Sequence, residues 1–270
     1  MQNSYYLKIT QGLRAGHLCY ASPTINMISK HIHSEYEFLY ILNGDLTYIV
    51  EDKKYKLKKY DLVITTPNQY HLIQIDSPAQ YERYNILFDP KLLGIEESLL
   101  FLNDIFVINC KHSPIISGLF QKMDYYAAIM DDEKFFKLVV GFIRELLYNI
   151  DIEKSFKNAP EQNIHPLVKS ALKIINDKLP EQINIKEITS SLYITESYFF
   201  KLFKQELKTT PHKYINEKRM FKAREMILQG TPPTQAYLCC GFSDYASFYR
   251  NYIKLFKISP SKEKNKSTQN

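Results

Sequence analysis

The spacing of hydrophobic and polar positions changes its character near residue 110. Before that point, short runs rich in Tyr, Ile, Val and Thr alternate with turn residues, as in EYEFLYILNGDLTYIVED, where Asn43, Gly44 and Asp45 form a turn between two runs. The segments KKYKLKKYDLVITTP and YERYNILFD have the same composition. Such residues favour strands, so the pattern over residues 17–110 predicts a small β-barrel or sandwich.

From about Ser113 the apolar residues recur at helical intervals. Two helices are predicted, over 113–130 and 133–150. The second carries two adjacent apolar stripes, which are Phe135, Val139, Phe142 and Leu146, and Phe136, Val140, Ile143 and Leu147. One stripe can pack on the barrel. The other either meets a second subunit or is buried within the same subunit.

The remainder of the chain is predicted to be helical. The polar stretch 151–163 is the predicted linker, and the lysine-rich tail 261–270 is predicted to be disordered. Between them lie six predicted helices, over 165–179, 185–192, 195–207, 211–228, 233–240 and 244–256. We therefore expect an α+β protein with an N-terminal domain (1–110), two intermediate helices and a linker (111–160), and a C-terminal helical domain (161–270).

Composition and charge narrow the function classes. The chain has 270 residues, of which 45% are hydrophobic, enough for about two domains with real cores. Residues 1–160 carry a net charge of −2 and residues 161–270 a net charge of +8, which favours a polyanionic partner for the second half. The sequence has no run of 18 apolar residues, no signal peptide pattern and no CxxC pair, so it predicts a cytoplasmic protein that does not span a membrane.

Two of the predicted helices repeat each other at an offset of 49 positions. TESYFFKLFKQEL begins at Thr195 and DYASFYRNYIKLF at Asp244, and both first residues are good N-caps. The offset aligns apolar with apolar and basic with basic positions, such as Lys201 with Arg250. The predicted outer faces are Ser197, Phe200, Lys201 and Lys204 in one helix, and Ala246, Tyr249, Arg250 and Ile253 in the other.

A short helix, a tight turn and a longer helix with a basic outer face form the helix-turn-helix arrangement, whose second helix enters the major groove of double-stranded DNA. Lys201 and Arg250 can donate hydrogen bonds to guanine, and Phe200 and Tyr249 can contact thymine methyl groups or sugars. The helix predicted from about residue 212 to 228 is roughly 25 Å long, a suitable spacer for two readers about one DNA turn apart. The alternative is a helical bundle that binds only protein.

Residues 165–262 resemble the DNA-binding domain of the AraC/XylS family of bacterial transcription regulators. The family pattern in the last stretch is matched by Gly241, Phe242, Phe248, Arg250 and Pro260, and its connecting helix by Arg219 and Ala223. The resemblance places base-reading residues at Ser197, Phe200 and Lys201 in the first copy, and at Ala246, Tyr249 and Arg250 in the second.

The chain also departs from the family pattern, mostly in the second copy. Lys257 stands where glycine is usual, and Thr189 and Tyr237 stand where alanine is usual. Ala246 offers no side-chain hydrogen bond. We therefore expect the first copy to read bases more strongly than the second.

The N-terminal half contains candidate metal ligands. In HIHSEYEFLYILNG, the side chains of His31, His33 and Glu37 are expected on one side of a strand, and His71 is expected near the end of another. Imidazoles and a carboxylate suit a divalent metal. The spacing resembles the first cupin motif and His71 the second, although Tyr60 stands where that motif has glycine. These residues can bind a metal, line an effector pocket, or have a purely structural role.

The family resemblance implies a ligand-responsive transcription regulator with a cupin-like effector domain and no catalytic residues. It implies a small-molecule effector, with sugars among the candidates, a homodimer assembled through the intermediate helices, and RNA polymerase as a further partner if the protein is an activator. The genes controlled would be metabolic ones, such as those for carbohydrate use. The alternative is a metal-dependent cupin enzyme with an accessory helical domain.

Overall fold

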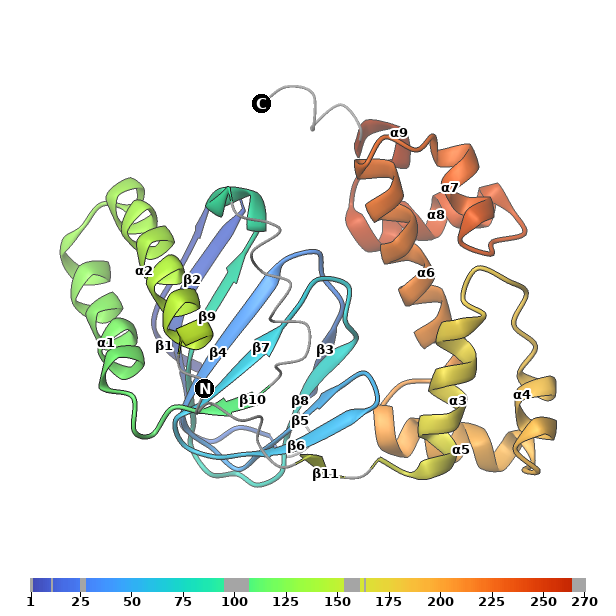
Figure 1. Cartoon of the computed structure of the whole chain (residues 1–270), viewed down its shortest axis with the longest axis horizontal. Coiled ribbons are helices and arrows are strands. Elements are labelled where there is room, and N and C mark those ends of the chain that lie inside the picture. Colours follow the sequence, from blue (N-terminus) through green and yellow to red (C-terminus); the bar gives the residue numbers. More distant parts are fainter. Residues whose placement is uncertain are drawn as a thin grey trace. The chain divides into compact units, whose positions relative to one another are not determined.

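The computed structural model describes residues 2–10, 12–24, 28–94, 107–152, 161–162 and 164–263. The chain divides into an N-terminal unit, Met1–Gln162, and a C-terminal unit, Asn163–Asn270 (Figure 1). Most of the predicted linker and of the predicted disordered tail lies outside the described residues. The intermediate helices belong to the N-terminal unit, and the separate role predicted for residues 111–160 stays a prediction.

Two antiparallel sheets confirm the predicted cupin-like, strand-rich domain and the α+β class. The six-stranded sheet has the order β1 (Gln2–Thr10), β2 (Leu13–Tyr20), β9 (Tyr81–Phe88), β4 (Tyr36–Asn43), β7 (Asp61–Thr65), β10 (Val107–Asn109). The five-stranded sheet has the order β11 (Glu161–Gln162), β6 (Lys53–Leu57), β5 (Leu46–Val50), β8 (His71–Ile75), β3 (Ile28–His31).

The turn at Gly44 exists, but it does not close a hairpin. Strand β4 pairs with β7 and β9, whereas β5 pairs with β6 and β8, so the turn carries the chain from one sheet to the other. Gly44 has a φ of +142°, a value that residues with a Cβ rarely adopt. The β6–β7 turn crosses between the sheets in the same way. Strand β1 precedes the region predicted as strands and pairs with β2.

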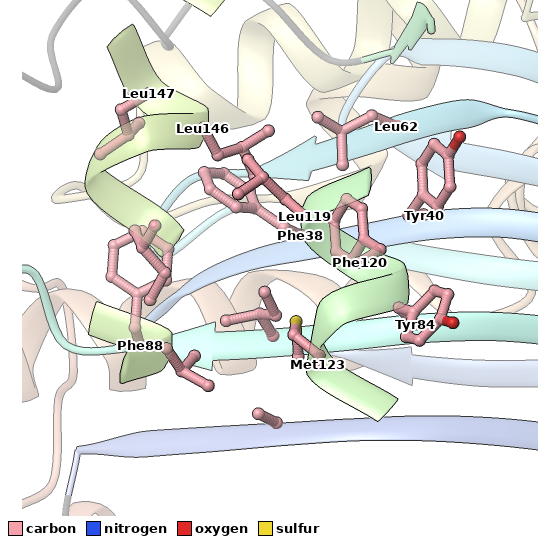
Figure 2. Close-up of a cluster of buried hydrophobic side chains, with 14 of the residues drawn as sticks. Phe38, Tyr40, Leu62, Tyr84, Phe88, Leu119, Phe120, Met123, Leu146 and Leu147 are labelled. Carbon is pink, nitrogen blue, oxygen red and sulfur yellow. The ribbon is translucent and has the colours of Figure 1, made fainter. Parts of the chain in front are cut away.

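Side-chain alternation along β4 gives the six-stranded sheet two different faces. Leu39 and Ile41 point inward and pack with Tyr48 and Ile73 of the other sheet. The residues between them, including Phe38 and Tyr40, point outward and pack beneath helices α1 (Pro114–Ile129) and α2 (Asp132–Ile152), as Figure 2 shows. The N-terminal unit therefore has one core between its sheets and a second core between the outer sheet face and the helices.

Two alternatives were left open for the apolar stripes of α2, contact with a second subunit and burial within the same subunit, and for Leu146 the second holds. This residue is 2% exposed, and residues of both stripes join the core formed with the sheet and α1. Phe142 and Val140 are half-buried against the same core. The helix sits in the angle between α1 and the sheet, which is why it needs two stripes.

A buried histidine fixes α1 to the sheet. On β2, His17 Nδ1 lies 3.0 Å from Asp124 of α1, and its Nε2 lies 3.0 Å from Glu82 of β9. The Tyr84 hydroxyl donates to the same Asp124 carboxylate at 2.6 Å. Burial alone would lower the pKa of His17, but the two carboxylates reverse this effect and raise it.

The C-terminal unit consists of short helices at the predicted places. They are α3 (Pro166–Asp177), α4 (Ile185–Ser191), α5 (Glu196–Leu207), α6 (Pro211–Leu228), α7 (Pro233–Cys239), α8 (Tyr245–Phe256) and α9 (Pro260–Glu263). All except α9 were predicted within about two residues. On the inner side of α5, Phe199 and Phe203 are fully buried, and on that of α8, Phe248 and Tyr252 are fully buried.

Two polar contacts, one from the middle and one from the second half, hold α6 in place. Arg219 donates from Nε to the carbonyl oxygen of Leu179 at 2.9 Å. Arg224 makes a two-pronged contact with the buried Glu263 carboxylate, at 3.0 and 2.7 Å. These bonds anchor α6 to the segment after α3 and to α9, so α6 can serve as a rigid spacer.

Among the described residues, none of the helices is both long enough and apolar enough to cross a lipid bilayer. The four cysteines are all free thiols.

Candidate effector site and nucleic-acid interface

Three of the four predicted ligands converge on the inner face of the N-terminal unit. Glu37 Oε2 lies 3.6 Å from His33 Nε2 and 3.2 Å from His71 Nε2. One ligand atom from each of the three lies within 4.8 Å of the others. The fourth candidate, His31, pairs through its backbone with His71, and its side chain lies outside the described part of the chain.

The surrounding bonds orient these groups. His33 Nδ1 lies 2.9 Å from the carbonyl oxygen of Glu35, and His71 Nδ1 lies 2.9 Å from that of Gln69. A carbonyl oxygen only accepts, so each Nδ1 carries a hydrogen and each neutral ring presents a lone pair at Nε2. This is the usual arrangement of a metal-binding histidine.

Two lone pairs and a carboxylate oxygen repel one another unless something positive or a donor lies between them. A proton on Nε2, a divalent metal or a donor group of a ligand can each meet this need. Burial opposes protonation of His33, but Glu37 beside it raises the pKa of the ring overall. The cluster therefore suits a metal, a protonated histidine or a hydroxyl-rich effector.

The sequence prediction missed two polar residues on the same face. Asn85 of β9 is buried and donates from Nδ2 to Glu37 Oε1 at 2.9 Å. Arg83, two positions earlier on β9, donates to the Tyr81 hydroxyl at 2.7 Å. The signal was present in YERYNILFD, because Arg83 and Asn85 are polar at alternate positions of a buried strand.

In the C-terminal unit, α4 and α5 form the first helix-turn-helix pair. Ser197, Lys201 and Lys204 of α5 are exposed. Phe200 is half-buried, with its ring centroid 5.6 Å from that of His212. The Thr195 hydroxyl caps the helix by accepting from the Tyr198 N–H at 3.3 Å.

Helices α7 and α8 form the second pair. Ala246 and Arg250 of α8 are exposed, and Tyr249 is half-buried. Asp244 caps the helix through the N–H groups of Ala246 and Ser247, and these bonds lower the pKa of its carboxyl. Arg250 also donates to the Ser247 hydroxyl at 3.2 Å.

The offset of 49 positions extends to the backbone. The C-cap residue after α5, Lys208, has a φ of +55°, and the C-cap residue after α8, Lys257, has a φ of +59°. This left-handed conformation favours glycine, which explains why glycine is the expected residue at position 257. The two pairs are therefore copies in sequence, in exposed face and in C-cap.

Comparison with known families decides the identity of the chain. The AraC-like ligand binding domain matches residues 18–121, and a helix-turn-helix domain matches residues 188–266. The chain belongs to the family of AraC-type transcriptional regulators. The two matches correspond to the N-terminal sheets with the start of α1 and to the two helix-turn-helix pairs.

Individual relatives agree with this assignment. The chain is 25% identical over 175 residues to the probable transcriptional regulator LumQ of Photobacterium leiognathi, covering 64% of this chain and 67% of that protein. It is 27% identical over 127 residues to the lactose operon transcription activator of Staphylococcus xylosus, covering 46% of this chain and 45% of that protein. This chain therefore spans about half the length of that second relative.

Among solved structures, an AraC-type DNA-binding domain protein from Chromobacterium violaceum is 30% identical. The match covers 38% of this chain and 94% of that one, with a TM-score of 0.35. As the family comparisons point to a regulator, they favour that function over the cupin enzyme.

Proposed function

We propose that this AraC-type regulator binds a specific DNA sequence through α5 and α8 and acts in the cytoplasm, where such DNA is found. The observation that carries the proposal is the repeated pair of helices with exposed basic residues, Lys201 and Arg250, in a segment of net charge +8. Helix α6 has 18 residues and is about 27 Å long, which suits two readers in successive major grooves.

In this proposal the residues divide into two classes of contact. Ser197, Phe200, Lys201 and Arg250 contact base edges, and Lys204 contacts a phosphate. Tyr249 supplies an apolar surface for a thymine methyl group or a sugar. Ala246 offers only its methyl group, so the second pair reads less sequence than the first.

The inner-face cluster of His33, Glu37 and His71 is the proposed effector site, extended by Arg83 and Asn85. Its imidazole, carboxylate, amide and guanidinium groups provide both donors and acceptors, which suits a hydroxyl-rich molecule such as a sugar. The name of one relative, a lactose operon activator, is compatible with this class. A divalent metal on the same three residues is the second candidate occupant.

Replacing His33 with alanine should abolish the effector response and leave basal DNA affinity within about twofold, because effector and DNA contacts lie in different units. The measurement is a reporter assay with a panel of mono- and disaccharides, together with a gel shift without sugar. If the variant keeps the wild-type dose response to the active sugar, His33 has no role in effector binding.

The proposed homodimer uses the outer face of α1 rather than the buried stripes of α2. Ile115, Tyr125 and Ile129 lie on one face of this helix and are 50%, 63% and 59% exposed. Exposed apolar side chains aligned on one helix suit association with a second copy. If the protein is an activator, RNA polymerase is a further partner.

Replacing Tyr125 and Ile129 together with serine should convert the dimer into a monomer without lowering the melting temperature by more than a few degrees. Leu146→Ser, in contrast, should lower it strongly, because it places a hydroxyl in the core. Sedimentation velocity and a thermal melt on the same samples measure both effects. A dimer that persists in the double variant would place the interface elsewhere.

A further inference from the structure

A cavity of about 850 Å³ lies on the outer face of the six-stranded sheet. Its walls come from the end of β4, the β6–β7 turn, the start of β9, and the segment that leads into α1. Along β4 it is lined by Tyr40 and Leu42, which alternate with the inward-pointing Leu39 and Ile41. The cavity is therefore separated from the Glu37 cluster by the sheet itself.

The rim of the cavity is basic. Lys59, Lys111 and His112 line it and are exposed, and none of the three forms an ion pair within the part of the chain that the structure describes. The one carboxylate in the lining, Glu82, already contacts His17 at 3.0 Å. The rim therefore offers two or three cationic donors without a competing anion.

A buried hydroxyl lies at the floor. Tyr40 is 1% exposed, and its ring stacks on Phe120 with centroids 4.6 Å apart. Its hydroxyl has no hydrogen bond of good geometry to a described residue. Burial raises the pKa of this hydroxyl, and the nearby Ser117 hydroxyl in the cavity wall partly opposes the rise. Figure 2 shows the Tyr40 and Tyr84 hydroxyls on the same side of the core. Buried hydroxyls normally have a partner, which a ligand can supply here.

The β6–β7 turn contributes a strained aromatic residue to the lining. Tyr60 has a φ of +71°, a left-handed conformation that is costly for a bulky residue and free of strain for glycine. Its N–H donates to Ile41 at 2.7 Å, and its carbonyl accepts from Cys110 at 2.8 Å, so the backbone is fixed in this conformation. The ring lies 6.3 Å from that of Tyr40, and Lys59 Nζ lies 5.0 Å from its centroid. Strained residues often have a functional reason.

We propose that this cavity binds a small carboxylic acid built on a six-membered ring, at a site distinct from the effector cluster. The carboxylate pairs with Lys59 and Lys111. The ring lies against the aromatic face of Tyr60, and the Tyr40 hydroxyl at the floor bonds to a polar atom of the ligand. An aromatic acid and a uronic acid share this chemistry, and both are smaller than the cavity.

Isothermal titration calorimetry of the full chain with sodium benzoate and with D-glucuronate tests the proposal and distinguishes the two ring types. At least one should bind with a dissociation constant in the millimolar range or tighter, and benzyl alcohol, which lacks the charge, should bind at least tenfold more weakly. Lys59→Gln combined with Lys111→Gln should lower the affinity for the carboxylic acid at least tenfold. If neither acid binds at 20 mM, the proposal fails.

Tyr60→Gly separates binding from folding. The substitution relieves the backbone strain, so the melting temperature should stay the same or rise, while the affinity for the carboxylate falls at least tenfold. Lys137→Gln, which removes one positive charge from the exposed side of α2 outside the cavity lining, should leave the affinity unchanged. Unchanged binding by Tyr60→Gly, or loss of binding by Lys137→Gln, would overturn the assignment.

Discussion

Replacing Lys201 with alanine is expected to weaken specific DNA binding by about 1–3 kcal/mol, or roughly 5- to 150-fold. Lys201 is exposed on the outer face of α5, opposite the buried Phe199 and Phe203. Its ammonium group is thus free to reach a guanine edge, and its loss should also relax the preference at one base pair. Fluorescence anisotropy with the operator and with single-base variants of it measures both quantities.

The matched control is Lys137→Ala, which removes the same charge from the exposed side of α2 in the other unit. It should change the affinity by less than twofold. If Lys201→Ala lowers the affinity for all sequences equally and reduces the salt dependence by about one phosphate contact, Lys201 contacts the backbone rather than a base. An affinity and base preference equal to those of the wild type would remove Lys201 from the interface.

Replacing Gly241 with alanine is expected to destabilise the C-terminal unit by about 2–4 kcal/mol. Gly241 follows α7 with a φ of +76°, and an added Cβ would lie 2.8 Å from the carbonyl oxygen of Pro180 and 2.9 Å from the Arg219 guanidinium. Because Arg219 is held by its bond to Leu179, and Pro180 contributes backbone, neither can move aside easily. Urea unfolding of the full chain, monitored by circular dichroism, measures the loss in the free energy of unfolding.

Gly230→Ala isolates the contribution of backbone strain. Gly230 has a φ of +104°, but a Cβ there would meet nothing within 4 Å. The backbone strain of an alanine at Gly230 is at least as large as at Gly241. Because the added Cβ meets no neighbour, Gly230→Ala should nevertheless lower the free energy of unfolding by about 1 kcal/mol less than Gly241→Ala, or by even less. Equal losses at the two positions would show that the close approach of Pro180 has no energetic importance.

The helices of the C-terminal unit could be predicted from sequence because their signals are local. Caps such as Thr195 and Asp244, Pro211 at the start of α6, and Gly241 after α7 each act within one turn of a helix. Strands β4 to β7 and β9 were found for the same reason, but β1 and the pairing of the strands were not. The turn at Gly44 was predicted, but the assignment of its flanking strands to different sheets was not, because pairing between distant strands has no local signal.

The candidate sites show the same limit. The spacing of His31, His33 and Glu37 could be recognised, and His71 could be added by its resemblance to a second motif. The prediction of one strand for the first three was wrong, because β3 ends at His31 and β4 begins at Tyr36, and His71 begins β8 instead of ending a strand. Asn85 was missed, since it reaches Glu37 only through the pairing of β4 with β9. The outer cavity was unpredictable for the same reason, because Tyr40, Tyr60 and His112 come together only in the fold.

The most direct test of the account is selection of DNA ligands from a random pool by the full chain, followed by hydroxyl-radical footprinting on the selected sequence. The account predicts one common sequence in which two segments of the DNA backbone are protected, about one helical turn, or roughly 34 Å, apart. Lys201→Ala should alter the segment read by α5, and Arg250→Ala the segment read by α8. A pool without a common sequence would contradict sequence-specific recognition by the two helix-turn-helix pairs. Equal affinity for the selected sequence and for random DNA at every salt concentration would contradict it as well.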